Sequence, residues 1–169
     1  MGVSDVAAKL FGMSPAVWER HANPWSGWSR LTALPLIALA AWSRVEIGFW
    51  SWALAAGVAL WIWLNPRLFP PPRRTDNWMS RGVLGERVWI ARASVPIPAH
   101  HRRAGAILNG LSAGASLAFV AGLVWLDPCV TLAGMLLAML AKLWFVDRMV
   151  WLYEDMRRVH PPYEAWMRP

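Results

Sequence analysis

The sequence predicts an all-α membrane protein in which four transmembrane helices form a polytopic bundle, and three observations lead to this fold class. Hydrophobic residues make up 57% of the 169-residue chain and charged residues only 16%, whereas a soluble domain carries about 25% charge. The apolar residues gather in four segments, and the basic residues gather at one side of these segments. The length allows a single domain, 1–169, and a lone cysteine, Cys129, excludes an internal disulfide.

The four predicted spans cover residues 28–42, 47–64, 104–126 and 130–153. A helix rises about 1.5 Å per residue and a bilayer core is about 30 Å thick, so roughly 20 residues are needed to cross it. The second and third spans contain no charged residue and meet this requirement. The first is short, and we expect the tryptophans at its entry, Trp25 and Trp28, to lie at the membrane interface and extend it. The fourth contains Lys142, whose stem we expect to reach the headgroups.

Short interfacial helices are predicted at the N-terminus and in the loop 65–103. Apolar residues between Val3 and Phe11 recur at spacings of three and four, as in a helix lying on a membrane surface. The loop is too long for a passive connector. Its prolines predict an extended start over 65–72, after which Thr75 or Asp76 is expected to cap a short helix.

The distribution of basic residues predicts the orientation in the membrane. All 17 of them except Arg44 fall in segment 1–30, in the loop 65–103, or from residue 142 onward. Because basic residues favour the cytoplasmic side, we expect a multi-pass protein of the inner (plasma) membrane. Both termini, the loop and the tail 157–169 then face the cytosol.

Small residues in the third span predict close helix packing. Gly110, Gly114, Ala118 and Gly122 repeat every four residues, which forms a smooth strip for a neighbouring backbone. Ala53 with Gly57, and Gly134 with Ala138, offer shorter strips. The pattern leaves open whether the partner is the same chain or another protein.

Polar residues at the membrane border are the candidate functional residues, because burying an ionisable group near lipid is costly. His21, Asp147 and Glu154 are the candidates for acid–base catalysis. The competing interpretation is an Arg–carboxylate network that only holds helix ends together. The candidate binding residues are Asn23, Asn65, Arg67, Trp78, Glu86, Arg87 and Arg148.

No metal site is predicted, and no cofactor is indicated. His100 and His101 sit beside Arg102 and Arg103, whose charge disfavours a cation. No two histidines have the three- or four-residue spacing of a helical zinc site, and nucleotide-binding glycine motifs are absent. Haem ligation by a single border histidine is left open. The basic residues mixed with the 14 tryptophans are explained by attraction to anionic lipid rather than to nucleic acid.

Three short motifs carry a resemblance to a known family. They are His21-Ala-Asn-Pro-Trp25, Asn65-Pro-Arg-Leu-Phe-Pro70 and Gly85-Glu-Arg-Val-Trp89. From about Trp18 to about Met156 the chain resembles a bacterial and archaeal family of small integral membrane proteins known only as a domain of unknown function. The segments 1–15 and 157–169 are expected to lie outside the shared pattern. The resemblance implies a helical membrane protein and brings no activity, substrate or cofactor.

Two hypotheses follow for the function. The first is a small accessory or assembly protein of the inner membrane, which packs against another membrane protein, a second copy or anionic lipid through its helices and basic cytoplasmic face. The second is an interfacial enzyme acting on a lipid-like or anionic headgroup substrate. The enzyme needs His21 and Glu154 in one cleft, with Arg67, Arg87 or Arg148 holding a phosphate or carboxylate.

Overall fold

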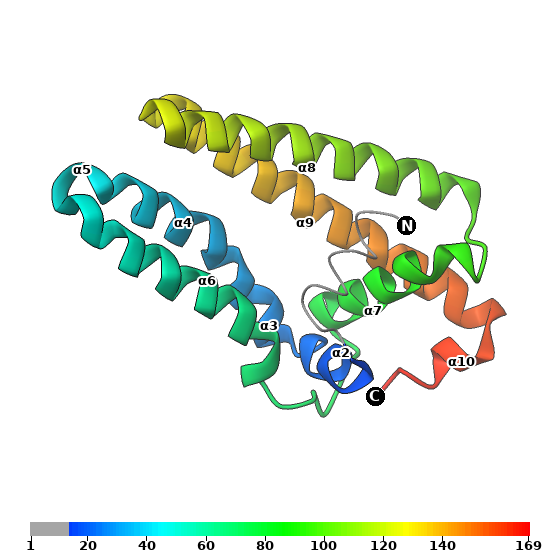
Figure 1. Cartoon of the computed structure of the whole chain (residues 1–169). Coiled ribbons are helices and arrows are strands. Elements are labelled where there is room, and N and C mark those ends of the chain that lie inside the picture. Colours follow the sequence, from blue (N-terminus) through cyan, green and yellow to red (C-terminus); the bar gives the residue numbers. More distant parts are fainter. Residues whose placement is uncertain (1–13) are drawn as a thin grey trace.

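The computed structural model describes residues 14–169, and all of their regular elements are helices. The N-terminal amphipathic helix expected before residue 12 lies outside the described residues. The order of the elements is α2 (Pro15–His21), α3 (Pro24–Ser29), η1 (Arg30–Thr32), α4 (Ala33–Trp42), α5 (Arg44–Ile47), η2 (Gly48–Trp50), α6 (Ser51–Leu68), α7 (Trp78–Ile90), η3 (Ala91–Ala93), α8 (Ala99–Trp125), α9 (Pro128–Val159) and α10 (Pro161–Glu164) (Figure 1).

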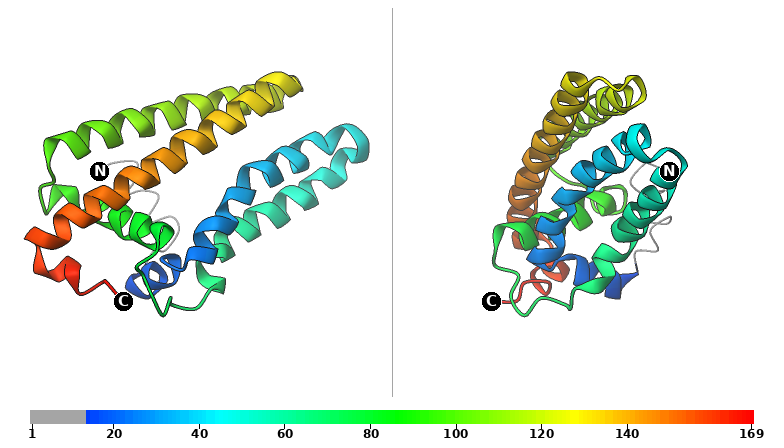
Figure 2. Two further views of the ribbon diagram at one scale, coloured as in Figure 1. Left: turned by 180° about the vertical axis from the view of Figure 1, so that it is seen from behind. Right: turned by 90° about the vertical axis from the view of Figure 1, so that its left-hand side faces the viewer.

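Two helical hairpins form the long part of the molecule. In the first, α4 and α6 lie side by side with α5 at the tip, and in the second α8 returns as α9 (Figures 1 and 2). The first tip contains Gly48 at φ +52°, a conformation that favours glycine. In the second tip, the Asp127 side chain accepts a hydrogen bond from Val130 N at 2.9 Å and caps α9, while Pro128 fits its first turn.

Three helical segments are long and apolar enough to cross a membrane: Pro24–Leu68, Ala99–Trp125 and Pro128–Val159. The first of them folds back on itself at α5 (Figure 1). The all-helical prediction is therefore confirmed, and three segments have the length and composition to cross a membrane. α8 begins before the predicted span 104–126, and α9 extends past both ends of the predicted span 130–153. Helical hydrogen bonding does not end where the apolar residues end.

The prediction that an extended loop begins at residue 65 is wrong. Asn65, Pro66 and Arg67 belong to the last turns of α6, and the backbone becomes extended only at Phe69. Proline usually ends a helix because it lacks an N–H donor. Here the side chain of Asn65 is bonded to Ser26 and Ser29 and holds the last turns in place.

The helix predicted in the loop is present as α7, but its cap is Asn77 rather than Thr75 or Asp76. The Asn77 side chain accepts a hydrogen bond from Ser80 N at 2.9 Å. The apolar face of α7 packs on α9, where Val83 and Val88 meet Met149 and Leu152 in the buried core. Burial of this face explains why a helix of 13 residues is stable.

The predicted four-residue strip on α8 does not form one seam. A Cβ on Gly122 would meet Thr131 N at 2.4 Å, and a Cβ on Gly134 would meet Phe119 N at 2.4 Å, so these glycines permit the close contact of α8 with α9. Gly110 and Gly114 have nothing within 4 Å of an added Cβ. The reason is that a strict four-residue repeat drifts around a helix of 3.6 residues per turn.

Arg44 joins the two hairpins at their tips. Its Nη2 donates to the carbonyl oxygens of Leu123 at 2.5 Å and Val124 at 3.1 Å. These carbonyl oxygens belong to the last turn of α8 and have no backbone N–H partner within the helix. A cation there is also favoured by the helix dipole. These hydrogen bonds give a structural role to Arg44, the one basic residue outside the three basic segments.

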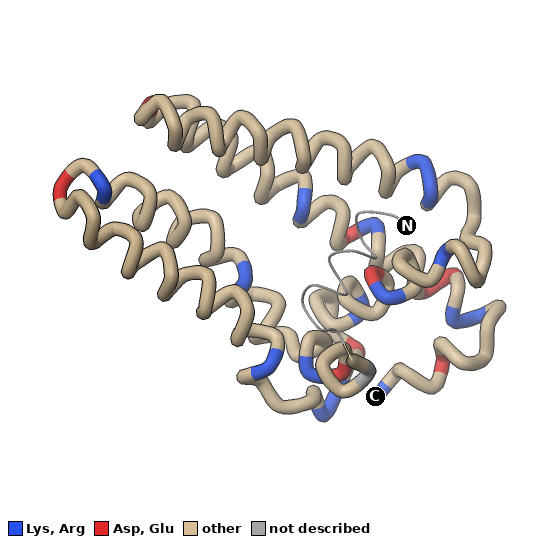
Figure 3. Tube along the Cα trace, viewed as in Figure 1, with Lys and Arg blue, Asp and Glu red and all other residues tan. Residues whose placement is uncertain are grey.

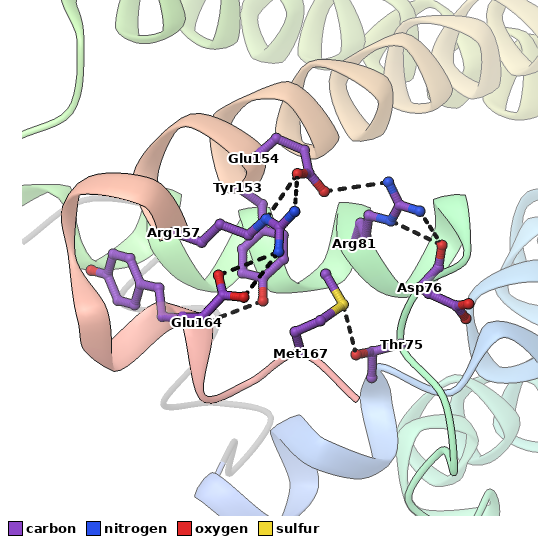
Figure 4. A network of polar contacts seen from close by, with 9 residues as sticks. Thr75, Asp76, Arg81, Tyr153, Glu154, Arg157, Glu164 and Met167 are labelled. Carbon is purple, nitrogen blue, oxygen red and sulfur yellow. Dashed lines mark hydrogen bonds and ion pairs between the residues drawn. The ribbon is translucent and has the colours of Figure 1, made fainter. Parts of the chain in front are cut away.

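The C-terminal tail folds back against α7 and α9. Tyr153 Oη donates to the carbonyl oxygen of Tyr163 at 3.0 Å. Thr75 N donates to the carbonyl oxygen of Arg168 at 2.8 Å, and Arg168 N donates to Thr75 Oγ1 at 2.8 Å. Arg157 bonds Glu154 and Glu164 beside these contacts (Figure 4). The tail is therefore an integral part of the fold.

Candidate functional site

A cluster of four ionisable side chains lies where the two hairpins and α7 meet. We call His21, Arg30, Glu86 and Lys142 the junction cluster. Arg30 Nη1 donates to the His21 ring, at 3.0 Å from Nδ1 and with closer contact to Nε2. Lys142 Nζ lies 2.5 Å from Glu86 Oε1. The Lys142 side chain is 52% exposed, so the expectation that its stem reaches the headgroups stays a prediction.

A chain of hydrogen bonds fixes the position of Arg30 in this cluster. Arg30 Nε donates to Ser26 O at 3.1 Å, and Ser26 Oγ donates to Asn65 Oδ1 at 3.2 Å. Asn65 Nδ2 donates in turn to Ser29 Oγ at 2.7 Å. Asn23 caps α3 through Trp25 N at 3.0 Å and donates to Pro70 O at 2.9 Å. The predicted residues Asn23 and Asn65 thus serve to anchor the polypeptide that carries Arg30.

The electrostatic environment keeps His21 neutral and Glu86 charged. Burial, together with the positive charge of Arg30, lowers the pKa of His21 from its usual 6.5 to about 3. Burial alone would raise the pKa of Glu86, but the charges of Lys142 and Arg30 outweigh it, and the pKa is lowered. A neutral imidazole can accept the hydrogen bond from Arg30 through an unprotonated nitrogen.

The lowered pKa of His21 makes stability depend on pH between 7 and 5. In this window the unfolded chain gains a proton at His21 and the folded chain does not, so acidification favours unfolding. We expect a loss of about 2 kcal/mol from pH 7 to pH 5. Denaturant unfolding in detergent measures this loss of unfolding free energy. His21→Gln should remove the contribution of about 2 kcal/mol, and the control His100→Gln should retain it. Equal pH dependence in wild type and His21→Gln would contradict the assignment.

Two predicted carboxylates face α7 instead of the junction cluster. Asp147 Oδ1 accepts a hydrogen bond from Trp78 Nε1 at 3.0 Å, and the Trp78 ring stacks on Trp28 with centroids 5.7 Å apart. Glu154 forms ion pairs with Arg81 at 3.3 Å and with Arg157 at 2.8 Å (Figure 4). Glu154 is thus paired with arginines, as in the Arg–carboxylate interpretation, whereas the partner of Asp147 is an indole N–H.

The three predicted anion-binding arginines lie apart from one another. Arg67 lies 4.1 Å above the Trp63 ring centroid, and Arg87 lies 4.1 Å above that of Trp166. Burial lowers the pKa of Arg87, partly opposed by the charge of Glu19. Arg148 is exposed on α9. These contacts place the arginines with aromatic rings or in solvent rather than around a common ligand.

Among the predicted residues, the structure brings His21 and Glu86 into one cluster and leaves Glu154 in another. Arg30 and Lys142, which complete the junction cluster, and Ser26, whose carbonyl oxygen binds Arg30, were missing from the predicted site. A sequence signal existed for two of them, because Arg30 and Lys142 are cations at the edge of or within apolar segments. The contact between them and Glu86 depends on how the hairpins meet, which no spacing along the chain indicates.

One group of described residues has the composition of a metal site, although none was predicted. The ligand atoms of His100, His101 and Asp155 lie within 4.8 Å of one another. His101 is buried and its Nε2 is 2.9 Å from Asp155 Oδ2. Arg102 and Arg103 follow directly in the sequence and disfavour a cation there. The same contact joins the start of α8 to the end of α9.

A family model for a family of unknown function (DUF6653) matches residues 2–168 of the chain. The chain belongs to this family. The DUF6653 match covers the tail and most of the N-terminus, so the expectation that 1–15 and 157–169 lie outside the shared pattern is wrong. The tail belongs to the shared pattern because it is bound to the rest of the fold, through contacts with Thr75, Tyr153 and Glu154. No curated protein and no solved structure matches this DUF6653 chain.

Proposed function

We propose that this protein is a non-catalytic accessory or assembly component of the bacterial or archaeal inner membrane, with four spans and a basic cytoplasmic face that binds anionic lipid. One observation carries the proposal. Charged residues gather at the end of the hairpins that holds α2, α7 and the C-terminus, while the hairpins themselves are almost free of charge among the described residues (Figure 3).

The helix lengths support two crossings by each hairpin. Residues 24–42 and α6 are about 28 Å and about 27 Å long at 1.5 Å per residue, which matches the hydrocarbon core. The 32 residues of α9 are longer than the core needs. The second hairpin therefore projects into the cytosol, where α7 and the tail pack on it at the level of the headgroups.

The exposed apolar surface supports packing against a membrane partner. Leu111, Leu117 and Val120 of α8 are more than half exposed, and Gly110 and Gly114 have open space beside them. In a membrane this face meets lipid or another helix, and small residues allow close approach of a helix. The enzyme hypothesis has less support, because Glu154 is held by Arg81 and Arg157 while His21 is held by Arg30.

The native cysteine provides a test of the topology. Cys129 is exposed at the tip of the second hairpin, so a membrane-impermeant maleimide should label it from outside intact spheroplasts. The matched control is Cys129→Ser with Ser94→Cys, which moves the thiol to the loop before α8 and should be labelled only in inside-out vesicles. Labelling of Cys129 only from the cytosolic side would overturn the orientation.

Native mass spectrometry after gentle extraction tests the accessory role. We expect the chain with bound anionic phospholipid and with a second membrane protein or a second copy. A bare monomer from every mild detergent would overturn the proposal.

A further inference from the structure

A pocket of about 160 Å³ lies between the two hairpins beside the junction cluster. Arg30 and Leu34 line it from the first hairpin, and Ser112, Ser116 and Lys142 line it from the second. The hairpins are joined at their tips by Arg44, and toward the other end Lys142 of the second hairpin pairs with Glu86 of α7. The pocket lies between these two contacts along the hairpin axis and is partly open at its side.

The pocket has a polar end and an apolar end. The chain runs from Arg30 to Leu34 toward the tip of the first hairpin, and from Ala138 to Lys142 away from the tip of the second. Both cations thus lie toward the proposed cytoplasmic border. Leu34 and Ala138 lie toward the membrane interior.

The positive charge in the junction cluster exceeds the negative charge. Arg30 and Lys142 contribute two positive charges, Glu86 contributes one negative charge, and His21 accepts a hydrogen bond as a neutral ring. Within the described part of the chain, Arg30 Nη2 has no hydrogen-bond partner. An uncompensated cation beside an apolar wall is costly at membrane depth, so an external anion would be favoured there.

We propose that this pocket binds the anionic headgroup of a membrane phospholipid, with Arg30 and Lys142 contacting its phosphate. A guanidinium presents donors that match phosphate oxygens, and an ammonium adds a point charge. The volume accommodates a phosphate and its nearest carbons, while the acyl chains remain in the bilayer past Leu34. This inference rests on the membrane topology proposed above and adds a single defined site to the general attraction of the basic face.

Native mass spectrometry of the full chain in micelles with equal phosphatidylglycerol and phosphatidylcholine tests the site. We expect wild type to retain one phosphatidylglycerol with at least about tenfold preference, since charged hydrogen bonds contribute this much. Arg30→Gln with Lys142→Gln should abolish the preference. The matched control, Arg102→Gln with Arg103→Gln, removes the same charge from exposed positions. This control variant should keep the preference for phosphatidylglycerol.

A second variant keeps the test decisive if the double substitution fails to fold. Leu34→Glu places a carboxylate four residues after Arg30, where it can compensate the charge in place of the lipid phosphate. We expect this variant to fold and to lose the bound phosphatidylglycerol. Retention of the lipid by both pocket variants would overturn the proposal.

A free anion is the competing occupant. Displacement of phosphatidylglycerol by excess sodium phosphate, with the same thermal stabilisation by phosphate alone, would overturn the phospholipid assignment. Failure of the topology is detected independently by maleimide labelling of Cys129. Correct labelling with no lipid preference would therefore reject only the pocket.

Discussion

Gly85→Ala is expected to destabilise the protein by about 3 kcal/mol, because an added methyl group would have to push α7 away from α9. A Cβ at Gly85 would lie 1.9 Å from the carbonyl oxygen of Met149 and 2.5 Å from its carbonyl carbon. These are backbone atoms, which cannot move aside as a side-chain end can. Separating the helices would also loosen the core around Val88 and Leu152.

Thermal and denaturant unfolding in detergent will measure this effect. Gly110→Ala and Gly114→Ala are the matched controls, since an added Cβ at either position meets nothing within 4 Å. Alanine favours a helix by up to about 1 kcal/mol over glycine, so the controls should be neutral or stabilising. Equal stability of Gly85→Ala and Gly110→Ala would show that α7 does not pack on α9 as described.

Glu86→Gln is the second substitution with a large expected effect, and it should lower the free energy of unfolding by about 3 kcal/mol. The substitution removes the carboxylate that lies 2.5 Å from Lys142 Nζ and leaves two cations in the junction cluster without a counter-charge. The side chain of Glu86 is only 14% exposed, so water can replace little of the lost interaction. Repulsion should also weaken the contact between the first hairpin and α9.

The exposed pair of Arg74 and Asp76 provides the control for this prediction. Its side chains are 70% and 42% exposed, so Asp76→Asn should cost less than about 1 kcal/mol. In a double-mutant cycle, Glu86→Gln with Lys142→Gln should cost less than the sum of the single changes. Additive costs would mean that the two residues do not interact.

Much of the helical layout could be predicted from the sequence, because apolar runs and helix signals act locally. The third and fourth apolar segments became α8 and α9, and Asp127-Pro128 supplied both the turn and the cap of α9. The sequence was less informative at Asn65-Pro66, where a local proline rule predicts a loop. The side chain of Asn65 reaches Ser26 and Ser29 across 39 and 36 residues, and such partners leave no local signal.

In the candidate site, too, the sequence indicated which residues matter locally but not which distant residues they contact. Ionisable residues near lipid drew attention to His21, Glu86, Asp147 and Glu154, but residue type alone did not assign their partners. The structure pairs Glu154 with Arg81 and places His21 beside Arg30. Which acid meets which base depends on the rotation of each helix about its axis, and that rotation is set by packing contacts such as Gly85 against Met149.

By itself, the sequence determined that this chain is helical, suited to a membrane and charged at one side, because composition, helix periodicity and charge counts are properties of continuous segments. Only the tertiary structure decided that the C-terminal tail belongs to the fold, that Gly110 and Gly114 face outward, and that Arg30, Glu86 and Lys142 share one site. Those facts depend on contacts between residues tens of positions apart, whose free energy is gained only when the hairpins and α7 pack together.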